Sequence, residues 1–154
     1  MVTEIAKNVR IFDELIGRTV KSVETRRDRD GDVLSIVVET GNGRDTLQYE
    51  FSHSQDCCED VRIEEVVGNW GDIVGRRLLM AEEVWHRGEV PDGAPKKRDE
   101  WYLESYTWTF YKFVSIRGGV TVRWLGESNG YYGEGVSFYR IDEKDAKVEL
   151  WVGE

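Results

Sequence analysis

The chain has 154 residues, with 30 acidic and 21 basic side chains and a formal net charge of −9. This length gives one domain with its own core, and a 12% aromatic content with only two prolines excludes intrinsic disorder and collagen-like sequence. The acidic balance argues against non-specific nucleic-acid binding, which needs a basic surface. No apolar run approaches the roughly 20 residues of a membrane span, so we expect neither membrane insertion nor a secretory signal.

The first segment, about residues 3–16, predicts a helix. Its apolar side chains recur at a spacing of three or four residues, at Ile5, Val9, Phe12 and Ile16. Thr3 supplies an N-cap, and Gly17 ends the helix. We expect this helix to pack one apolar stripe on a sheet.

From Thr19 onward the pattern changes to the alternation typical of strands. The predicted strands are 19–27, 32–40, 47–52, a short one near 61–66, 77–87, 101–116, 120–125, 136–141 and 147–152. A helix is an alternative for 77–87, because Leu, Met, Ala and Glu favour it. Asp30-Gly31 and Gly118-Gly119 are hairpin turn signals.

The fold class that follows is mainly β, with α+β as an alternative. We expect an antiparallel sandwich or open barrel of about eight strands with one N-terminal helix. The whole chain, 1–154, forms a single domain with its β core at about 19–152. Most aromatic residues lie between Trp101 and Tyr139, on both faces of the predicted strands. Rings on both faces favour full burial or an interface, so we expect a homodimer or higher oligomer.

Cys57 and Cys58 are the only cysteines, and they are adjacent. A disulfide between neighbours is strained and rare, and two cysteines without a signal peptide indicate a reducing, intracellular setting. The structural interpretation places one cysteine in the core as a small apolar residue.

The stretch 53–65 also carries five acids and His53. Three chemical alternatives stay open there. The carboxylates are a candidate site for a hard cation, although no loop shows EF-hand-like spacing. His53 with one of the cysteines is a candidate zinc site, although the usual ligand spacing is absent. A cysteine nucleophile needs a base, which only His53 or His86 can supply, and the nearby carboxylates raise a thiol pKa.

The second unusual stretch is the glycine-rich loop 126–135. It combines two adjacent tyrosines, Tyr131 and Tyr132, with small polar residues and flanking acids. Rings beside adaptable polar groups are typical of recognition surfaces, and such tyrosines can stack on a base. The structural alternative is a hairpin whose rings fold onto the sheet. Glu127 and Glu134 form a weak candidate pair for acid–base chemistry.

Common enzyme motifs are absent from the sequence. It contains no phosphate-binding loop, dinucleotide fingerprint, His-Glu-x-x-His or Gly-x-Ser-x-Gly motif. We therefore expect a protein that is not an enzyme and uses neither a cofactor nor a metal. The enzyme alternative is a metal-assisted or cysteine-dependent hydrolase centred on His53 and Cys57.

Two motifs carry a resemblance to a known family. They are His53-Ser54-Gln55-Asp56-Cys57-Cys58-Glu59 and Gly126-Glu127-Ser128-Asn129-Gly130-Tyr131-Tyr132. With them the chain, from about Leu15 to Ile141, resembles a family of small uncharacterised proteins encoded largely by bacteriophages. The resemblance implies a phage origin and a place in the cytoplasm of the infected bacterial host. It implies no established activity.

Small acidic phage proteins without enzyme motifs are often inhibitors of host defence, a context that no single residue proves. The resulting hypothesis is a non-enzymatic binding protein that captures a nucleotide-like signal or a host protein. An acidic mimic of nucleic acid is the further alternative. The expected ligand-binding residues are His53, Gln55, Asp56, Cys57, Glu59, Arg123, Glu127, Ser128, Asn129, Tyr131 and Tyr132.

Each residue has an expected role in this site. Tyr131 and Tyr132 stack on the ligand, and Ser128 and Asn129 hydrogen-bond it. His53 and Gln55 orient its polar groups. The positive charge that a phosphate needs comes from Arg123 or Arg117.

Overall fold

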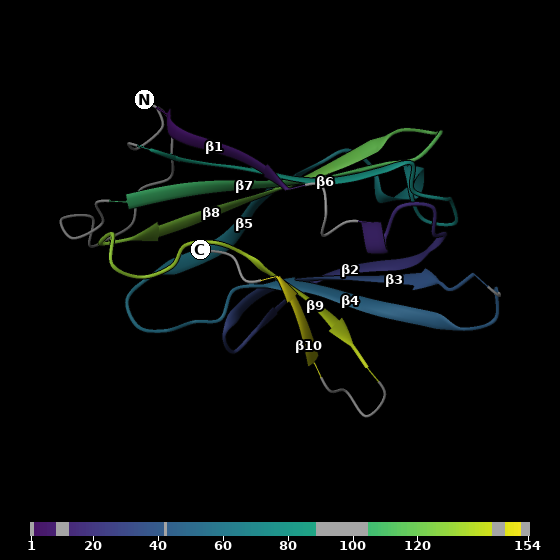
Figure 1. Ribbon diagram of the computed structural model, residues 1–154, viewed down its shortest axis with the longest axis horizontal. Coiled ribbons are helices and arrows are strands. Elements are labelled where there is room, and N and C mark those ends of the chain that lie inside the picture. The colour runs from purple at the N-terminus through teal and green to yellow at the C-terminus, as the bar shows by residue number, and fades with distance from the viewer. Residues whose placement is uncertain (1, 9–12, 42, 89–104, 143–146, 152–154) are drawn as a thin grey trace.

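The computed structural model describes residues 2–8, 13–41, 43–88, 105–142 and 147–151, and for 2–8 and 151 the backbone alone. Ten strands form two antiparallel five-stranded sheets, which lie as two layers in Figure 1. The first sheet has the order β1-β6-β7-β8-β5 and the second β10-β9-β4-β3-β2. The strands are β1 Val2–Asn8, β2 Val20–Asp28, β3 Gly31–Glu39, β4 Thr46–Ser52, β5 Asp60–Val67, β6 Met80–Gly88, β7 Ser105–Val114, β8 Gly119–Ser128, β9 Ser137–Ile141 and β10 Lys147–Trp151.

The mainly β prediction is confirmed, and the sheets do not close into a barrel. The described residues contain no α-helix, only short 3-10 turns at residues 13–14 and at Trp70–Asp72. Within this part of the chain no helix is long and apolar enough to cross a membrane.

The inner faces of the two sheets share one core. Phe51 of the second sheet packs its ring 4.6 Å from Tyr111 and 5.9 Å from Phe113, both on the first sheet. Phe51 also lies 4.7 Å from Phe138 within its own sheet. These rings are fully buried, and burying aromatic side chains contributes much of the stability of such a core.

Strand β7 carries aromatic side chains on both faces, as its alternation predicts. Tyr111 and Phe113 belong to the shared core. Tyr106 and Trp108 form a separate buried cluster with Leu125 of β8. This second cluster follows from the two-residue repeat of a β-strand, in which neighbouring side chains point to opposite faces of the sheet. The predicted start of this strand, at 101–104, lies outside the described residues.

The predicted N-terminal helix is wrong. Residues Val2–Asn8 form β1, which pairs antiparallel with β6 from Val2 opposite Gly88 to Asn8 opposite Glu83. Three of these residues are β-branched and suit a strand. An exposed edge of β6 supplies backbone partners along the whole segment, and such tertiary pairing overrides a weak helical preference. Val9 and Phe12, which shaped the helical pattern, lie outside the described residues.

Candidate functional site

The two unusual sequence stretches meet in the structure. β5 pairs with β8 so that Asp60 lies opposite Glu127. Further along, Nδ1 of His53 lies 2.8 Å from the carbonyl oxygen of Gly135. A carbonyl only accepts hydrogen bonds, so Nδ1 carries the proton. The segment 53–60 therefore contacts the glycine-rich loop near both of its ends.

The turn 55–59 is held by its own side chains. Nε2 of Gln55 donates to the carbonyl oxygens of Cys57, at 3.3 Å, and Glu59, at 2.9 Å. In return Oε1 of Glu59 accepts from the backbone N–H groups of Asp56, at 2.9 Å, and Cys57, at 3.0 Å. Charge-assisted bonds to two backbone donors are strong ones, so this turn has a defined shape.

Cys57 and Cys58 are joined by a disulfide, and both are exposed. The expectation of a cysteine in the core is therefore wrong, and so is the argument against a bond between neighbours. Glu59 takes the buried position of the turn instead, with a side chain only 1% exposed. It does so because its carboxylate finds two backbone donors there, which offset the cost of leaving water.

His53 and Glu59 form a second buried contact. Nε2 of His53 lies 3.6 Å from Oε2 of Glu59, and neither atom has a hydrogen-bond partner among the residues that the structure describes. Since Nδ1 already donates to Gly135, a neutral ring presents an unprotonated Nε2 to the carboxylate.

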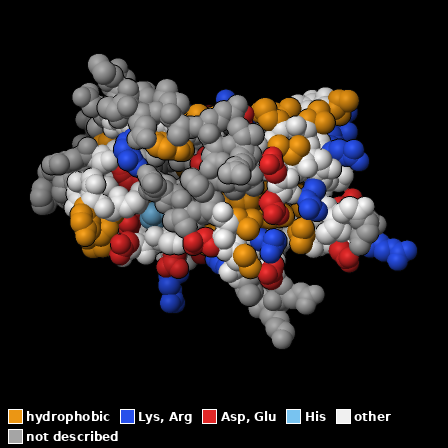
Figure 2. Space-filling model, viewed as in Figure 1, with side chains coloured by type: hydrophobic (Ala, Val, Ile, Leu, Met, Phe, Trp, Pro, Cys, Tyr) orange, Lys and Arg blue, Asp and Glu red, His pale blue; other side chains and the backbone are white. Residues whose placement is uncertain are grey.

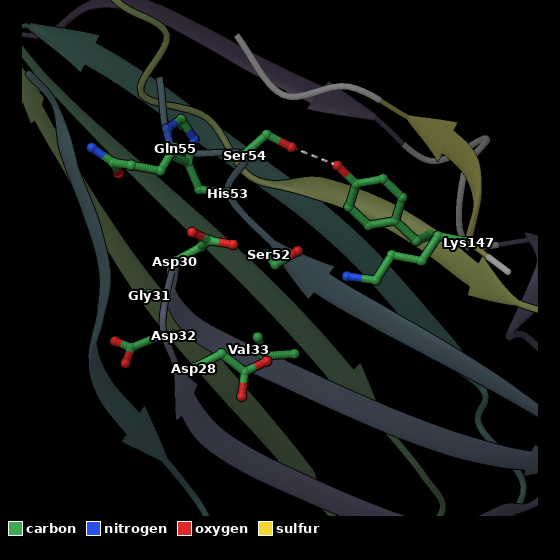
Figure 3. A pocket seen from close by; sticks show the side chains of 11 residues that line it. Asp28, Asp30, Gly31, Asp32, Val33, Ser52, His53, Ser54, Gln55 and Lys147 are labelled. Carbon is green, nitrogen blue, oxygen red and sulfur yellow. Dashed lines mark hydrogen bonds between the residues drawn. The ribbon is translucent and has the colours of Figure 1, made fainter. Parts of the chain in front are cut away.

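A cavity of about 290 Å³ opens beside His53 (Figure 3). Its carboxylates come from the hairpin that joins β2 to β3, namely Asp28, Asp30 and Asp32. Lys147 of β10 lies on the opposite side, and its Nζ is 3.5 Å from Glu50. Asp28 is paired with Arg26 and Lys147 with Glu50, so the carboxylates of Asp30 and Asp32 give the cavity its negative character.

Polar groups complete the wall of this cavity. Oγ of Ser54 and the hydroxyl of Tyr139 lie 2.9 Å apart, as the dashed line in Figure 3 shows. Gln55 also lines the cavity, so the cavity and the turn 55–59 share a side chain. The cavity is therefore continuous with the first of the two predicted stretches.

In the glycine-rich loop, the small polar residues shape the backbone. Oγ of Ser128 accepts from the N–H of Gly130 at 2.9 Å and donates to the carbonyl of Tyr132 at 3.3 Å. Oδ1 of Asn129 accepts from the N–H of Tyr131 at 3.0 Å. Ser128 is fully buried, so its predicted ligand contact is replaced by a structural one.

The two tyrosines differ in exposure. Tyr131 is 84% exposed, and its ring meets that of Tyr132 edge to face at 5.1 Å. A large ring held in solvent by an ordered turn is available to a ligand. The alternative in which both rings fold onto the sheet does not hold for Tyr131.

The predicted arginines are not at this site. Arg123 pairs with Glu65 at 2.8 Å and lies over the ring of Trp108 at 4.9 Å. Arg117 lies in the turn between β7 and β8, at the opposite end of β8 from Ser128. The ten-residue strand β8 separates Arg117 from Ser128, whereas Arg123 lies in the middle of that strand, with its guanidinium group held by Glu65 and the ring of Trp108. The phosphate-binding role expected for them stays a prediction.

Glu127 and Glu134 are both buried, on different partners. Glu127 accepts from Arg62 at 3.2 Å, and Arg62 also bonds Asp60 and Glu64. Glu134 accepts from Ser105 at 2.9 Å, and burial raises the pKa of its carboxyl despite this bond. Both side chains are buried and bonded to other protein groups, and the ligand contact expected for Glu127 stays a prediction.

The sequence interpretation missed the acidic hairpin and one buried acid. Three aspartates at alternate positions, 28, 30 and 32, were the available signal, but their place beside His53 depends on strand order. Burial raises the pKa of Glu83 to about 7, although the hydroxyl of Tyr111 donates to it at 2.6 Å. Nothing in the local pattern of β6 marks Glu83 as a core residue of this kind.

The described residues hold no group of three or more His, Cys, Asp or Glu side chains arranged for a metal ion. With their sulfurs bonded to each other, Cys57 and Cys58 present no thiolate as ligand or nucleophile in this form. On the face seen in Figure 2, acidic side chains are interspersed with basic and apolar ones. Among the described side chains of this face they form no continuous stripe of the kind that a nucleic-acid mimic requires.

Comparison with known proteins places the chain in a family. No curated protein and no solved structure matches it. A family model described as a domain of unknown function, DUF7448, matches residues 13–138. This match covers both unusual stretches, β2 to β8 and the first residues of β9. The chain belongs to the DUF7448 family.

Proposed function

We propose that this chain is a non-enzymatic binding protein that inhibits host defence in the cytoplasm of a phage-infected bacterium by capturing a host factor. The resemblance to phage-encoded proteins supports the setting. One observation carries the binding role: an acidic cavity lies beside His53, which in turn contacts the loop that exposes Tyr131. A concave polar site next to an exposed ring suits recognition.

The charge of the cavity favours a host factor with a positively charged group over a phosphate-bearing nucleotide. Carboxylates near a phosphate raise its energy, and they lower the energy of a guanidinium or ammonium group. Lys147, the cation of the cavity wall, is close to Glu50. The exposed ring of Tyr131, which is not part of the cavity wall, offers a separate face on which a flat or cationic group of the same partner can stack.

Variants of single residues test this proposal. Asp30→Asn removes one charge from the cavity, and it is preferable to Asp28, which bonds Arg26, and Asp32, which bonds the N–H of Ile63. Glu24→Gln is the matched control, because Glu24 is an exposed acid on β2 that does not line the cavity. Tyr131→Ala removes the exposed ring.

Tagged wild type and variants are recovered from infected bacteria, and each complex is measured by native mass spectrometry. We expect the wild type and Glu24→Gln to retain the same protein partner, and Asp30→Asn and Tyr131→Ala to lose most of it without unfolding. The spectrum also counts subunits and so tests the expected homo-oligomer. A nucleotide-sized adduct on the wild type would show that the captured ligand is a nucleotide signal and not a host factor. Equal recovery by all four proteins would overturn the site.

A further inference from the structure

The turn 55–59 presents a disulfide to solvent. Cys57 and Cys58 are both exposed, while Glu59, next in sequence, is buried. We propose that Cys57 and Cys58 form a thiol–disulfide exchange site, which small thiols reduce and small disulfides re-oxidise in the folded protein. Exchange depends on access of a thiolate to sulfur, and here the sulfurs are reached without opening the core.

The step balances in atoms and electrons. A small thiolate attacks one sulfur, the bond between Cys57 and Cys58 breaks, and the second sulfur leaves as a thiolate. A second small thiol then attacks the mixed disulfide. The products are two cysteine thiols and one oxidised small disulfide, so two electrons pass from the small thiols to the protein. In a reducing cytoplasm exchange runs towards the dithiol form.

The backbone of this turn is held by groups that exchange does not consume. Gln55 bonds the carbonyl of Cys57, and Glu59 bonds its N–H. These contacts keep the two cysteines in register after reduction, so that closing the bond again needs little ordering. The disulfide is thus a reversible feature on a turn whose shape is set by other side chains.

The charge around the turn selects among reductants. Asp56 is an exposed acid adjacent to Cys57, and the whole chain carries a net charge of −9. Negative potential lowers the local concentration of an anionic thiol such as glutathione. A neutral dithiol should therefore react faster than an anionic monothiol at equal thiolate concentration, with a difference that shrinks as salt is added.

Thiol counting on the native protein tests the proposal. The purified chain is equilibrated in graded mixtures of reduced and oxidised dithiothreitol, trapped by alkylation and weighed by mass spectrometry. We expect no alkylated cysteine at the oxidising end and two at the reducing end, with full return on re-oxidation and no denaturant. Two free thiols in every mixture, or reduction that needs denaturant, would overturn the proposal. The readout requires no ligand, so it is independent of the proposed function.

Three variants complete the test. In Cys57→Ser the remaining thiol should take up one small thiol as a mixed disulfide and form no intramolecular bond. Gln55→Ala removes the hydrogen bond to the carbonyl of Cys57, so the reduced cysteines can move apart. The thiol–disulfide equilibrium constant should therefore shift about 5-fold towards the thiols. Ser54→Ala, which alters a neighbour outside the turn, should leave it unchanged. If Gln55→Ala and Ser54→Ala have the same thiol–disulfide equilibrium constant, the hydrogen bonds of Gln55 do not hold the disulfide form.

Discussion

His53 donates through Nδ1 to the carbonyl oxygen of Gly135, 82 residues further along the chain, at 2.8 Å. The ring thus joins the segment after β4 to the end of the glycine-rich loop. Its other nitrogen faces the buried carboxylate of Glu59. One side chain therefore couples the disulfide turn to the loop that exposes Tyr131, and we expect its loss to destabilise both segments.

His53→Ala should destabilise the fold by about 1–3 kcal/mol, because it leaves the buried carbonyl of Gly135 without its donor. His53→Asn is the matched variant, since the Nδ2 of asparagine lies near the position of Nδ1 and can donate to the same oxygen. We expect it to recover part of the loss. Urea unfolding measures both, and an equal loss in the two variants would show that this hydrogen bond is not the cause.

Gly126 allows the glycine-rich loop to fold back onto β8. A Cβ at this position would lie 2.3 Å from the carbonyl oxygen of Glu134 and 2.7 Å from its Cβ. Gly126→Ala should therefore displace the loop and cost about 1–3 kcal/mol. Hydrogen exchange at 129–135 should rise with it.

Gly41→Ala is the control for that experiment, because a Cβ there meets nothing within 4 Å and its φ is not positive. We expect its stability to stay within about 0.5 kcal/mol of the wild type. If Gly126→Ala is tolerated as well as Gly41→Ala, the close approach of the loop to β8 is incorrect.

Glu83 should make stability fall as pH rises. Burial raises its pKa in the folded chain to about 7, against an ordinary value of 4.5. Below pH 4.5 the carboxyl is protonated in both states and the fold has its full stability. Between pH 4.5 and 7 only the unfolded chain loses the proton, so up to about 3 kcal/mol is lost, and the loss levels off above pH 7.

Glu83→Gln tests this, since the amide stays neutral and still accepts from the hydroxyl of Tyr111. We expect the variant to be more stable than the wild type at pH 8 and similar to it at pH 4.5. Denaturant unfolding at both pH values gives the comparison. Parallel pH profiles for the two proteins would be inconsistent with a buried, neutral Glu83.

Arg62 neutralises acids on both strands of the β5–β8 pair. Arg62→Met leaves Glu127 as a fully buried carboxylate without its guanidinium, which should cost about 3–5 kcal/mol. The double variant with Glu127→Gln should recover a large part, because a neutral amide is far less costly to bury. Unfolding free energies of the single and double variants measure the coupling. Strict additivity would contradict a direct interaction.

The strand pattern was accessible from sequence because alternation is a local property. β7 shows this best: Tyr111 and Phe113 enter the core, and Tyr106 and Trp108 lie on the other face. The hairpin near Asp30-Gly31 was accessible for the same reason, but the turn lies one residue earlier than predicted: Asp28 pairs with Gly31, so Arg29 and Asp30 form the two-residue loop. Such features depend on backbone geometry over a few residues.

The N-terminal strand was not accessible in this way. Whether Val2–Asn8 is helical or extended depends on the free edge of β6, more than 70 residues away. The exposed cysteines were missed for a related reason, because the buried place in their turn goes to the residue whose polar atoms find partners, Glu59.

By itself the sequence determined a mainly β chain and marked two unusual stretches, of which the cavity takes only His53, Ser54 and Gln55. Tertiary structure decided which of their residues meet. It set His53 against Gly135, brought Asp30 and Lys147 to one cavity, and kept Arg123 away beside Glu65. The physical reason is that alternation specifies which face a side chain takes, whereas strand order and non-local packing specify its neighbours.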